Sequence, residues 1–196
     1  MLAGSDFQGR AEAMLRTGGA RVALHVRGPA TTGRALHEHV RALLSTAHAS
    51  GARLFVNDRV DVALAADDVG VHLGARSLPV RDTRALVGPN RTVGVSVHDA
   101  GEAERAESEG ANFAFVGNVF ATASHPGRPG IGTAELGRIC ARAPGLPVMA
   151  IGGVRPEHVP ALVAAGALGV AVLGGAWSRP DAGAAVEEYL DALAGC

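Results

Sequence analysis

Short apolar runs alternate with helical stretches along the chain, and this alternation most strongly constrains the fold. Most runs are hydrophobic throughout rather than at every second position, which is typical of parallel strands covered on both faces. Strands that alternate with helices form βαβ units, so the pattern predicts a parallel sheet. The predicted strands are 21–27, 53–57, 69–73, 91–97, 112–119, 147–151 and 169–173, and the predicted helices are 7–17, 32–50, 59–66, 80–86, 99–109, 133–142, 156–165 and 182–194.

We therefore predict an α/β fold, specifically a (β/α)8 TIM barrel, as a single domain over residues 1–196. A closed barrel of this kind has eight strands and eight helices, and the pattern supplies one strand too few. Only Met1-Leu2-Ala3-Gly4 and two further residues precede the first predicted helix. We expect the first strand of the barrel to be short or missing.

Composition argues against several classes of function. The net charge is −1, no basic run stands out and aromatic residues make up 4%, so we expect no nucleic-acid partner. No run approaches the roughly 18 apolar residues of a membrane span, and a signal pattern is absent, so we expect no membrane partner and a cytoplasmic location. The two cysteines, Cys140 and Cys196, lack metal-ligand spacing with histidines, so we expect no metal site.

The chain contains no lysine, because all 18 basic residues are arginine. Schiff-base chemistry needs a side-chain amine, and the sequence offers no candidate for one. Any cation that contacts a substrate must therefore be an arginine, a protonated histidine or a bound ion.

Two glycine doublets follow the last two predicted strands, Gly152–Gly153 after 147–151 and Gly174–Gly175 after 169–173. Glycine lacks a Cβ, so its backbone N–H can approach a ligand closely. A glycine turn that leads into a helix offers free N–H donors to a phosphate, and barrels often bind phosphate after their last two strands. A lone doublet is more often only a turn, but this pair predicts a phosphate site.

Other candidates stand at the ends of the earlier strands, because active sites of such barrels lie at the carboxyl ends of the strands. Arg27 could bind an anion bidentately, or it could be an ordinary surface arginine. Asn57 could hold a ligand, and Asp58 could ligate a cation or simply cap the next helix. His72 could exchange protons or be a satisfied core histidine, and Ser96 could donate to a ligand.

The longest predicted loop runs from 117 to 132 and carries Thr122, Ser124 and His125. The two hydroxyls stand two residues apart, so they could point at one group. A loop of this composition can close over a substrate. The alternative is an ordinary surface loop rich in proline and glycine.

Several ordered motifs resemble those of the thiamine-phosphate synthase superfamily, and the resemblance covers nearly the whole chain apart from the first barrel strand. The synthase branch joins a pyrimidine pyrophosphate to a thiazole phosphate with Mg, and the tautomerase branch isomerises a thiazole phosphate carboxylate. The resemblance implies that both doublets hold the thiazole phosphate, that Thr122 and Ser124 lie at the substrate, and that the protein is a homodimer. It also implies that Arg27, Asn57 and Asp58 face the pocket. The motifs are Leu54–Ala65, Gly70–Gly74, Gly94–His98, Val116–Ser124 and Ala150–Val154.

Departures from the synthase pattern favour the other branch. Pro29 and His125 stand where the synthase pattern has lysines, and Ala75 and Ser77 stand where it has glutamine and a metal-binding aspartate. Loss of one electrostatic donor typically costs about 3 kcal/mol of transition-state stabilisation, so we expect negligible synthase activity.

The tautomerase branch resembles this chain better, although its proton-shuttling histidine is Asn118 here. An amide cannot shuttle protons at neutral pH, so we expect His125 to act as general acid and base, with Asn118 and His72 beside it. The sequence thus predicts a metal-independent thiazole tautomerase-like isomerase whose partner is a small thiazole phosphate, with no cofactor. The alternatives are a synthase, which would use Mg, and a non-catalytic binder of thiazole or thiamine phosphate.

Overall fold

The computed structural model describes residues 6–28, 30–122, 127 and 129–196. Its strands and helices alternate in chain order from residue 7 onward, as the apolar pattern predicts. The strands are β1 (Ala23–Val26), β2 (Arg53–Asn57), β3 (Val69–Leu73), β4 (Val93–Val97), β5 (Phe113–Gly117), β6 (Val148–Ile151) and β7 (Gly169–Ala171). The helices are α1 (Phe7–Gly18), η1 (Gly19–Arg21), α2 (Gly33–Ser50), α3 (Val60–Leu64), α4 (Val80–Val87), α5 (Ala100–Ser108), α6 (Gly132–Arg142), η2 (Pro156–His158), α7 (Val159–Ala164), α8 (Gly174–Trp177) and α9 (Ala182–Ala194).

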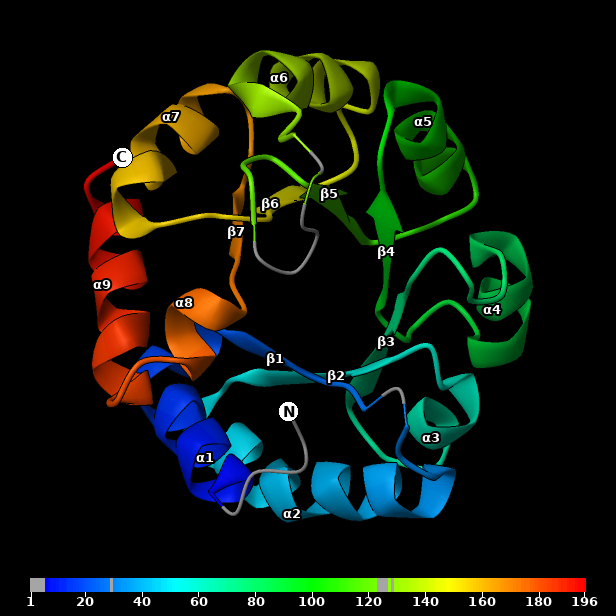
Figure 1. Ribbon diagram of the computed structural model, residues 1–196. Coiled ribbons are helices and arrows are strands. Elements are labelled where there is room, and N and C mark those ends of the chain that lie inside the picture. Colours follow the sequence, from blue (N-terminus) through cyan, green and yellow to red (C-terminus); the bar gives the residue numbers. More distant parts are fainter. Residues whose placement is uncertain (1–5, 29, 123–126, 128) are drawn as a thin grey trace.

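The strands form one parallel sheet in the order β1-β2-β3-β4-β5-β6-β7. The sheet curls around a central axis, and the helices lie outside it (Figure 1). In the part of the chain that the structure describes, no ladder joins β7 to β1. The parallel α/β architecture is confirmed, but the prediction of a closed eight-stranded barrel is wrong, because the seven strands leave the curled sheet open along one side.

Helix packing covers the open side. Helix α1 packs against both α9 and α2, and α8 lies near the same opening (Figure 1). Phe7 of α1 stacks on Trp177 of α8, with ring centroids 5.4 Å apart. Apolar side chains of α1, α2, β1 to β3 and α9 form one buried cluster, and those of β5, β6 and their flanking helices form a second.

Local capping explains where several helices begin and end. The Thr32 side chain accepts a hydrogen bond from the Ala35 N–H at the start of α2, and Asp99 accepts one from Glu102 N–H at the start of α5. Helix α2 ends at Gly51, which adopts a left-handed conformation with φ of 75°. The capping side chains accept hydrogen bonds from backbone N–H groups that have no partner within the helix. The left-handed glycine turns the chain away from the helix axis and ends the helix.

The last strand and the helix after it differ from the prediction. β7 ends at Ala171 rather than at 173, because Leu173 leaves the extended conformation and starts α8. The single helix predicted over residues 156–165 is instead the short 3-10 turn η2 followed by α7. None of the described helices combines the length and the apolar character that crossing a membrane requires.

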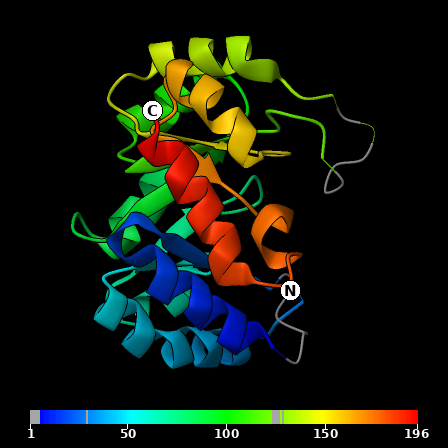
Figure 2. The same cartoon turned by 90° about the vertical axis from the view of Figure 1, so that its left-hand side faces the viewer.

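The described residues that follow β5 and helix α8 both lie at one end of the molecule, shown on the right of Figure 2. This is the end to which the carboxyl ends of the strands point, because all strands are parallel and these segments follow β5 and β7. The predicted site residues therefore come from the same edge of the sheet.

Candidate functional site

Five of the residues that the sequence analysis selected lie at the carboxyl ends of the first four strands, at one edge of the sheet. Asn57 lies in register with His72 on the neighbouring strand. The His72 Nε2 atom is hydrogen-bonded to Ser96 Oγ at 3.0 Å. The charges of Asp58 and Arg27 both act on the His72 ring. These five residues therefore converge at the carboxyl end of the first four strands.

His72 is buried, with only 1% of its surface exposed. Burial lowers its pKa to about 4; nearby Asp58 opposes this shift and Arg27 adds to it. The imidazole is consequently neutral near pH 7. General acid and base catalysis works best when the pKa lies near the working pH, so His72 is better suited to hydrogen bonding than to proton exchange.

His25, which the sequence analysis did not select, completes this inner surface. Its ring stacks on Phe55 with centroids 4.8 Å apart and lies 5.1 Å from the ring of His72. Burial, and then the neighbouring His72, hold the pKa of His25 well below its usual range. His25 and Arg27 lie two residues apart on the same predicted strand, so their side chains share one face of it. This spacing could have identified His25 from the sequence.

Four buried polar atoms near this edge have no hydrogen-bond partner within the described part of the chain. They belong to four different segments, and buried polar groups normally have a partner. Ordered water is the usual partner of such buried groups. The atoms are His25 Nδ1, Asn57 Oδ1, His72 Nδ1 and Asn118 Nδ2.

Asp58 does not cap the helix that follows it. Its Oδ1 atom accepts hydrogen bonds from the Gly74 N–H at 3.0 Å and from the Ser77 hydroxyl, and α3 begins at Val60 without a side-chain cap. Asp58 has a positive φ of 64°, a conformation that is costly for residues other than glycine and clusters at functional sites. The fold thus turns this carboxylate toward the loop after β3.

The first glycine doublet forms a tight turn after β6. Gly152 and Gly153 have φ values of 99° and 65°. A Cβ on Gly152 would collide with the Asn118 side chain, and one on Gly153 would lie 2.5 Å from the Ala121 carbonyl oxygen. The turn therefore packs against the start of the connection after β5, and only glycine fits there.

The second doublet has a different structure, because Gly174 and Gly175 form the first turn of α8. Neither has a positive φ. A Cβ on Gly174 would have space, whereas one on Gly175 would collide with the Tyr189 hydroxyl of α9. That hydroxyl donates a hydrogen bond to the Val154 carbonyl at 3.0 Å.

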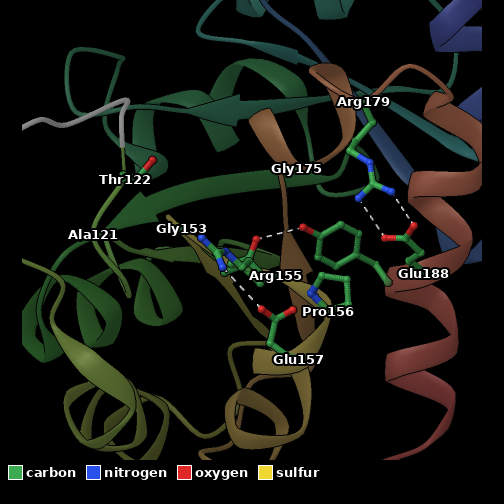
Figure 3. Close-up of a pocket in the computed structure, with 11 residues that line it drawn as sticks. Ala121, Thr122, Gly153, Arg155, Pro156, Glu157, Gly175, Arg179 and Glu188 are labelled. Atoms are coloured by element: carbon green, nitrogen blue, oxygen red, sulfur yellow. Dashed lines mark hydrogen bonds and ion pairs between the residues drawn. The ribbon is translucent and has the colours of Figure 1, made fainter.

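A pocket of about 760 Å³ lies between the two glycine turns and α9 (Figure 3). Two arginines and two glutamates line it together with one glycine of each doublet. Arg155 follows the first doublet by two residues, which was a usable signal in the sequence, whereas no local pattern indicates Arg179, Glu188 or Tyr189. The lining residues are Ala121, Thr122, Gly153, Val154, Arg155, Pro156, Glu157, Gly175, Arg179, Glu188 and Tyr189.

The connection after β5 contributes Thr122 to this pocket. The Asn118 backbone carbonyl accepts a hydrogen bond from the Ile131 N–H at 2.8 Å. Ser124 and His125 lie outside the described residues, so their predicted roles stay predictions.

Among the described residues, no three histidine, cysteine, aspartate or glutamate side chains form a group that could hold a metal ion.

Comparison with known proteins identifies relatives along nearly the whole chain. The family model for thiamine monophosphate synthase matches residues 2–176. A thiamine-phosphate synthase of Roseiflexus castenholzii is 42% identical over 90% of this chain and 77% of its own length. One of Methanoculleus marisnigri is 41% identical over 90% of this chain and 83% of its own.

The solved structure of thiamine phosphate pyrophosphorylase from Pyrococcus furiosus superimposes with a TM-score of 0.87 and 30% sequence identity, covering 97% of this chain and 91% of that one. A 3-hexulose-6-phosphate synthase structure, at 21% identity and a TM-score of 0.66, shares the fold.

These relatives overturn one part of the sequence interpretation. They are named thiamine-phosphate synthases, which are transferases, and nothing among them supports the tautomerase branch. The prediction of a thiazole tautomerase-like isomerase is therefore wrong, and so is the argument that the missing lysines disfavour the synthase. The superfamily itself is confirmed: this chain belongs to the thiamine monophosphate synthase family.

Proposed function

We propose that this protein is a thiamine-phosphate synthase, a transferase that joins a pyrimidine pyrophosphate to a thiazole phosphate. The observation that carries the proposal is the likeness, over nine-tenths of the chain, to relatives that bear this name. The geometry of the carboxyl edge supports it, because this edge offers a neutral polar surface, a rim carboxylate and a glycine turn beside a pocket.

The inner surface suits the pyrimidine ring. His72 and, by the direction of its pKa, His25 are neutral near pH 7, and Asn57 and Ser96 are partly buried polar side chains on the same edge of the sheet. A neutral surface of this kind binds an uncharged heterocycle without burying an unpaired charge. We assign Asn57 and Ser96 to this half of the substrate.

The resemblance to the synthase branch implies Mg, and Asp58 fits that ion. Hydrogen bonds from described residues reach only its Oδ1 atom, which leaves Oδ2 for a cation. Mg²⁺ often binds through one or two carboxylates together with substrate phosphates and waters. When bound, the ion would neutralise charge that develops on the leaving pyrophosphate.

Arg27 supplies the fixed positive charge on the same side. It lies close enough to affect His72, and an arginine fork binds two phosphate oxygens at once. In this lysine-free chain, Arg27 and the ion held by Asp58 would share the stabilisation of the leaving group, while Asn118 and Thr122 border the thiazole phosphate.

The test is to incubate the purified protein with a pyrimidine pyrophosphate and a thiazole phosphate, with Mg²⁺ or with a chelator, and to detect thiamine phosphate by mass spectrometry. We expect product only with Mg²⁺. Binding of both substrates without product would identify a non-catalytic binder instead.

Asp58→Asn provides the sharper version of this test. The substitution removes the carboxylate charge but keeps a side chain that tolerates a left-handed backbone, so we expect a rate at least about a hundredfold lower, the usual size of a lost electrostatic contribution. Asp68→Asn is the matched control, because Asp68 also has a positive φ and is exposed outside the site. Equal activity of the two variants would exclude the role assigned to Asp58.

A further inference from the structure

We propose that Arg155 is the side chain that contacts the phosphate of the thiazole substrate and supplies the positive charge of that subsite. The inference rests on the proposed function and adds a residue that neither the motifs nor the relatives' names assign. Arg155 lies two residues beyond the first glycine turn and lines the pocket between the two turns (Figure 3).

The position of Arg155 is fixed by the turn that precedes it. Gly153 packs against Ala121 and Phe120, and the Val154 carbonyl is held by the Tyr189 hydroxyl. Arg155 itself is extended, with φ of −125° and ψ of 161°. The backbone immediately before Arg155 is therefore held in place, and Arg155 lines the pocket with an exposed side chain.

The guanidinium of Arg155 is poorly satisfied by the protein. Within the described chain its one ion pair is with Glu157 at a long 3.7 Å, and its side chain is 73% exposed. An arginine fork has five N–H donors arranged to match phosphate oxygens. These donors remain available to an anion that sits on the amides of the Gly152–Gly153 turn.

Arg179, the other arginine of the pocket, is committed elsewhere. Its two terminal nitrogens donate to the two Glu188 carboxylate oxygens at 3.1 and 2.7 Å. Recruiting it would break a bidentate pair, whereas recruiting Arg155 only lengthens a contact that is already long. The difference between the two arginines places the anion on the Arg155 side of the pocket.

Glu157 opposes the same anion. Its carboxylate is 63% exposed beside Arg155, so it repels a phosphate and competes for the guanidinium. Two substitutions should therefore act in opposite directions. Arg155→Gln removes the attractive charge, and Glu157→Gln removes the competing one while keeping nearly the same shape.

The experiment measures KM for each substrate and kcat in Arg155→Gln, Arg155→Lys and Glu157→Gln. We expect Arg155→Gln to raise KM for the thiazole phosphate about 10- to 100-fold, as expected for a lost hydrogen bond to a charged group. KM for the pyrimidine pyrophosphate and kcat should change less than about twofold. The reason is that Arg155 would bind the thiazole phosphate equally strongly in the ground state and in the transition state. Arg155→Lys should recover part of the loss, and Glu157→Gln should lower KM for the thiazole phosphate severalfold.

Arg138→Gln is the matched control, because Arg138 is 71% exposed and pairs with Glu135 on α6, outside the pocket lining. Calorimetry adds a readout that does not need turnover. The wild type should prefer the thiazole phosphate to the unphosphorylated thiazole alcohol, and Arg155→Gln should lose most of that preference.

The outcomes separate the two proposals. A wild type that binds the thiazole phosphate and makes no product overturns the synthase proposal, and calorimetry on Arg155→Gln still tests this one. A synthase whose KM for the thiazole phosphate is unchanged in Arg155→Gln overturns the Arg155 assignment alone. Equal losses for phosphate and alcohol would also overturn it.

Discussion

The two glycine doublets are nearly indistinguishable as sequence patterns, yet the fold uses them differently. Gly152 and Gly153 need positive φ angles and approach the backbone of residues 118–121. Gly174 and Gly175 adopt helical geometry at the start of α8. The first doublet is therefore required by backbone conformation and packing, whereas in the second only Gly175 is constrained, and by a side chain.

Tyr189 connects the two turns. Its hydroxyl donates to the Val154 carbonyl just after the first doublet and lies where a Cβ of Gly175 would be. Helix α9 thereby holds both turns against one pocket. Two Gly-Gly doublets are thus coupled by Tyr189, a residue that belongs to neither of them.

The largest expected effect is that of Gly153→Ala. The left-handed conformation costs about 1–3 kcal/mol for a residue with a Cβ, and overpacking against Ala121 and Phe120 adds to it. We expect the free energy of unfolding, measured by urea denaturation, to fall by at least about 2 kcal/mol. Gly51→Ala is the control, because Gly51 has φ of 75° but its nearest neighbour is Ala20 Cβ at 3.6 Å. Equal losses of unfolding free energy in the two variants would mean that packing around Gly153 adds nothing to the cost of the left-handed conformation.

Gly175→Ala should have the next largest effect. The new methyl group displaces the Tyr189 hydroxyl from Val154, so we expect a loss of about 1–3 kcal/mol in unfolding free energy. In a Tyr189→Phe background the same substitution should cost less, because the displaced atom is gone. A double-mutant cycle measures this coupling, and strict additivity would contradict the connection through Tyr189.

A smaller effect is expected for Arg10→Ala, which tests the support of the second turn from α1. Arg10 donates to the carbonyls of Trp177, Arg179 and Pro180 at 2.9, 2.5 and 3.2 Å. We expect a loss of about 1–2 kcal/mol and faster hydrogen exchange in residues 174–180. Arg16→Ala, which breaks an exposed pair with Glu12, should cost less than about 1 kcal/mol. Unchanged exchange in Arg10→Ala would contradict this support.

The smallest effect is expected for Gly174→Ala. A Cβ there would have only Ser178 Oγ nearby, at 3.9 Å, and alanine is favoured over glycine within a helix by about 0.5–1 kcal/mol. Thermal unfolding should show a neutral or slightly stabilised protein. Marked destabilisation would mean that the two doublets are less different than the structure indicates.

Much of the fold followed from local patterns. Strand 69–73 is buried at every position and is apolar apart from His72. Caps such as Thr32 and Asp99 act within a few residues of the helices they start. The pattern also supplied one strand too few for a closed barrel, but it could not report whether the two edge strands pair, because that pairing joins segments far apart in the chain.

The candidate site was predictable only in part. Asn57, His72 and Ser96 could be proposed because they stand at the carboxyl ends of predicted strands, and the structure brings His72 and Ser96 into contact. Asp58 was interpreted with two alternatives, and the helix-cap alternative is wrong because its carboxylate reaches residues 16 and 19 positions away. Contacts over such separations leave no periodic signal.

The sequence by itself determined the strand and helix pattern, the glycine turns, the lysine-free set of cations and the membership of a family, because propensity, periodicity and motif spacing are local properties. Only the tertiary structure decided that the sheet stays open, that His25 and His72 are neutral, and that Arg155 is available while Arg179 is paired with Glu188. Burial and charge pairing depend on segments distant in the chain, so these properties exist only once the chain has folded.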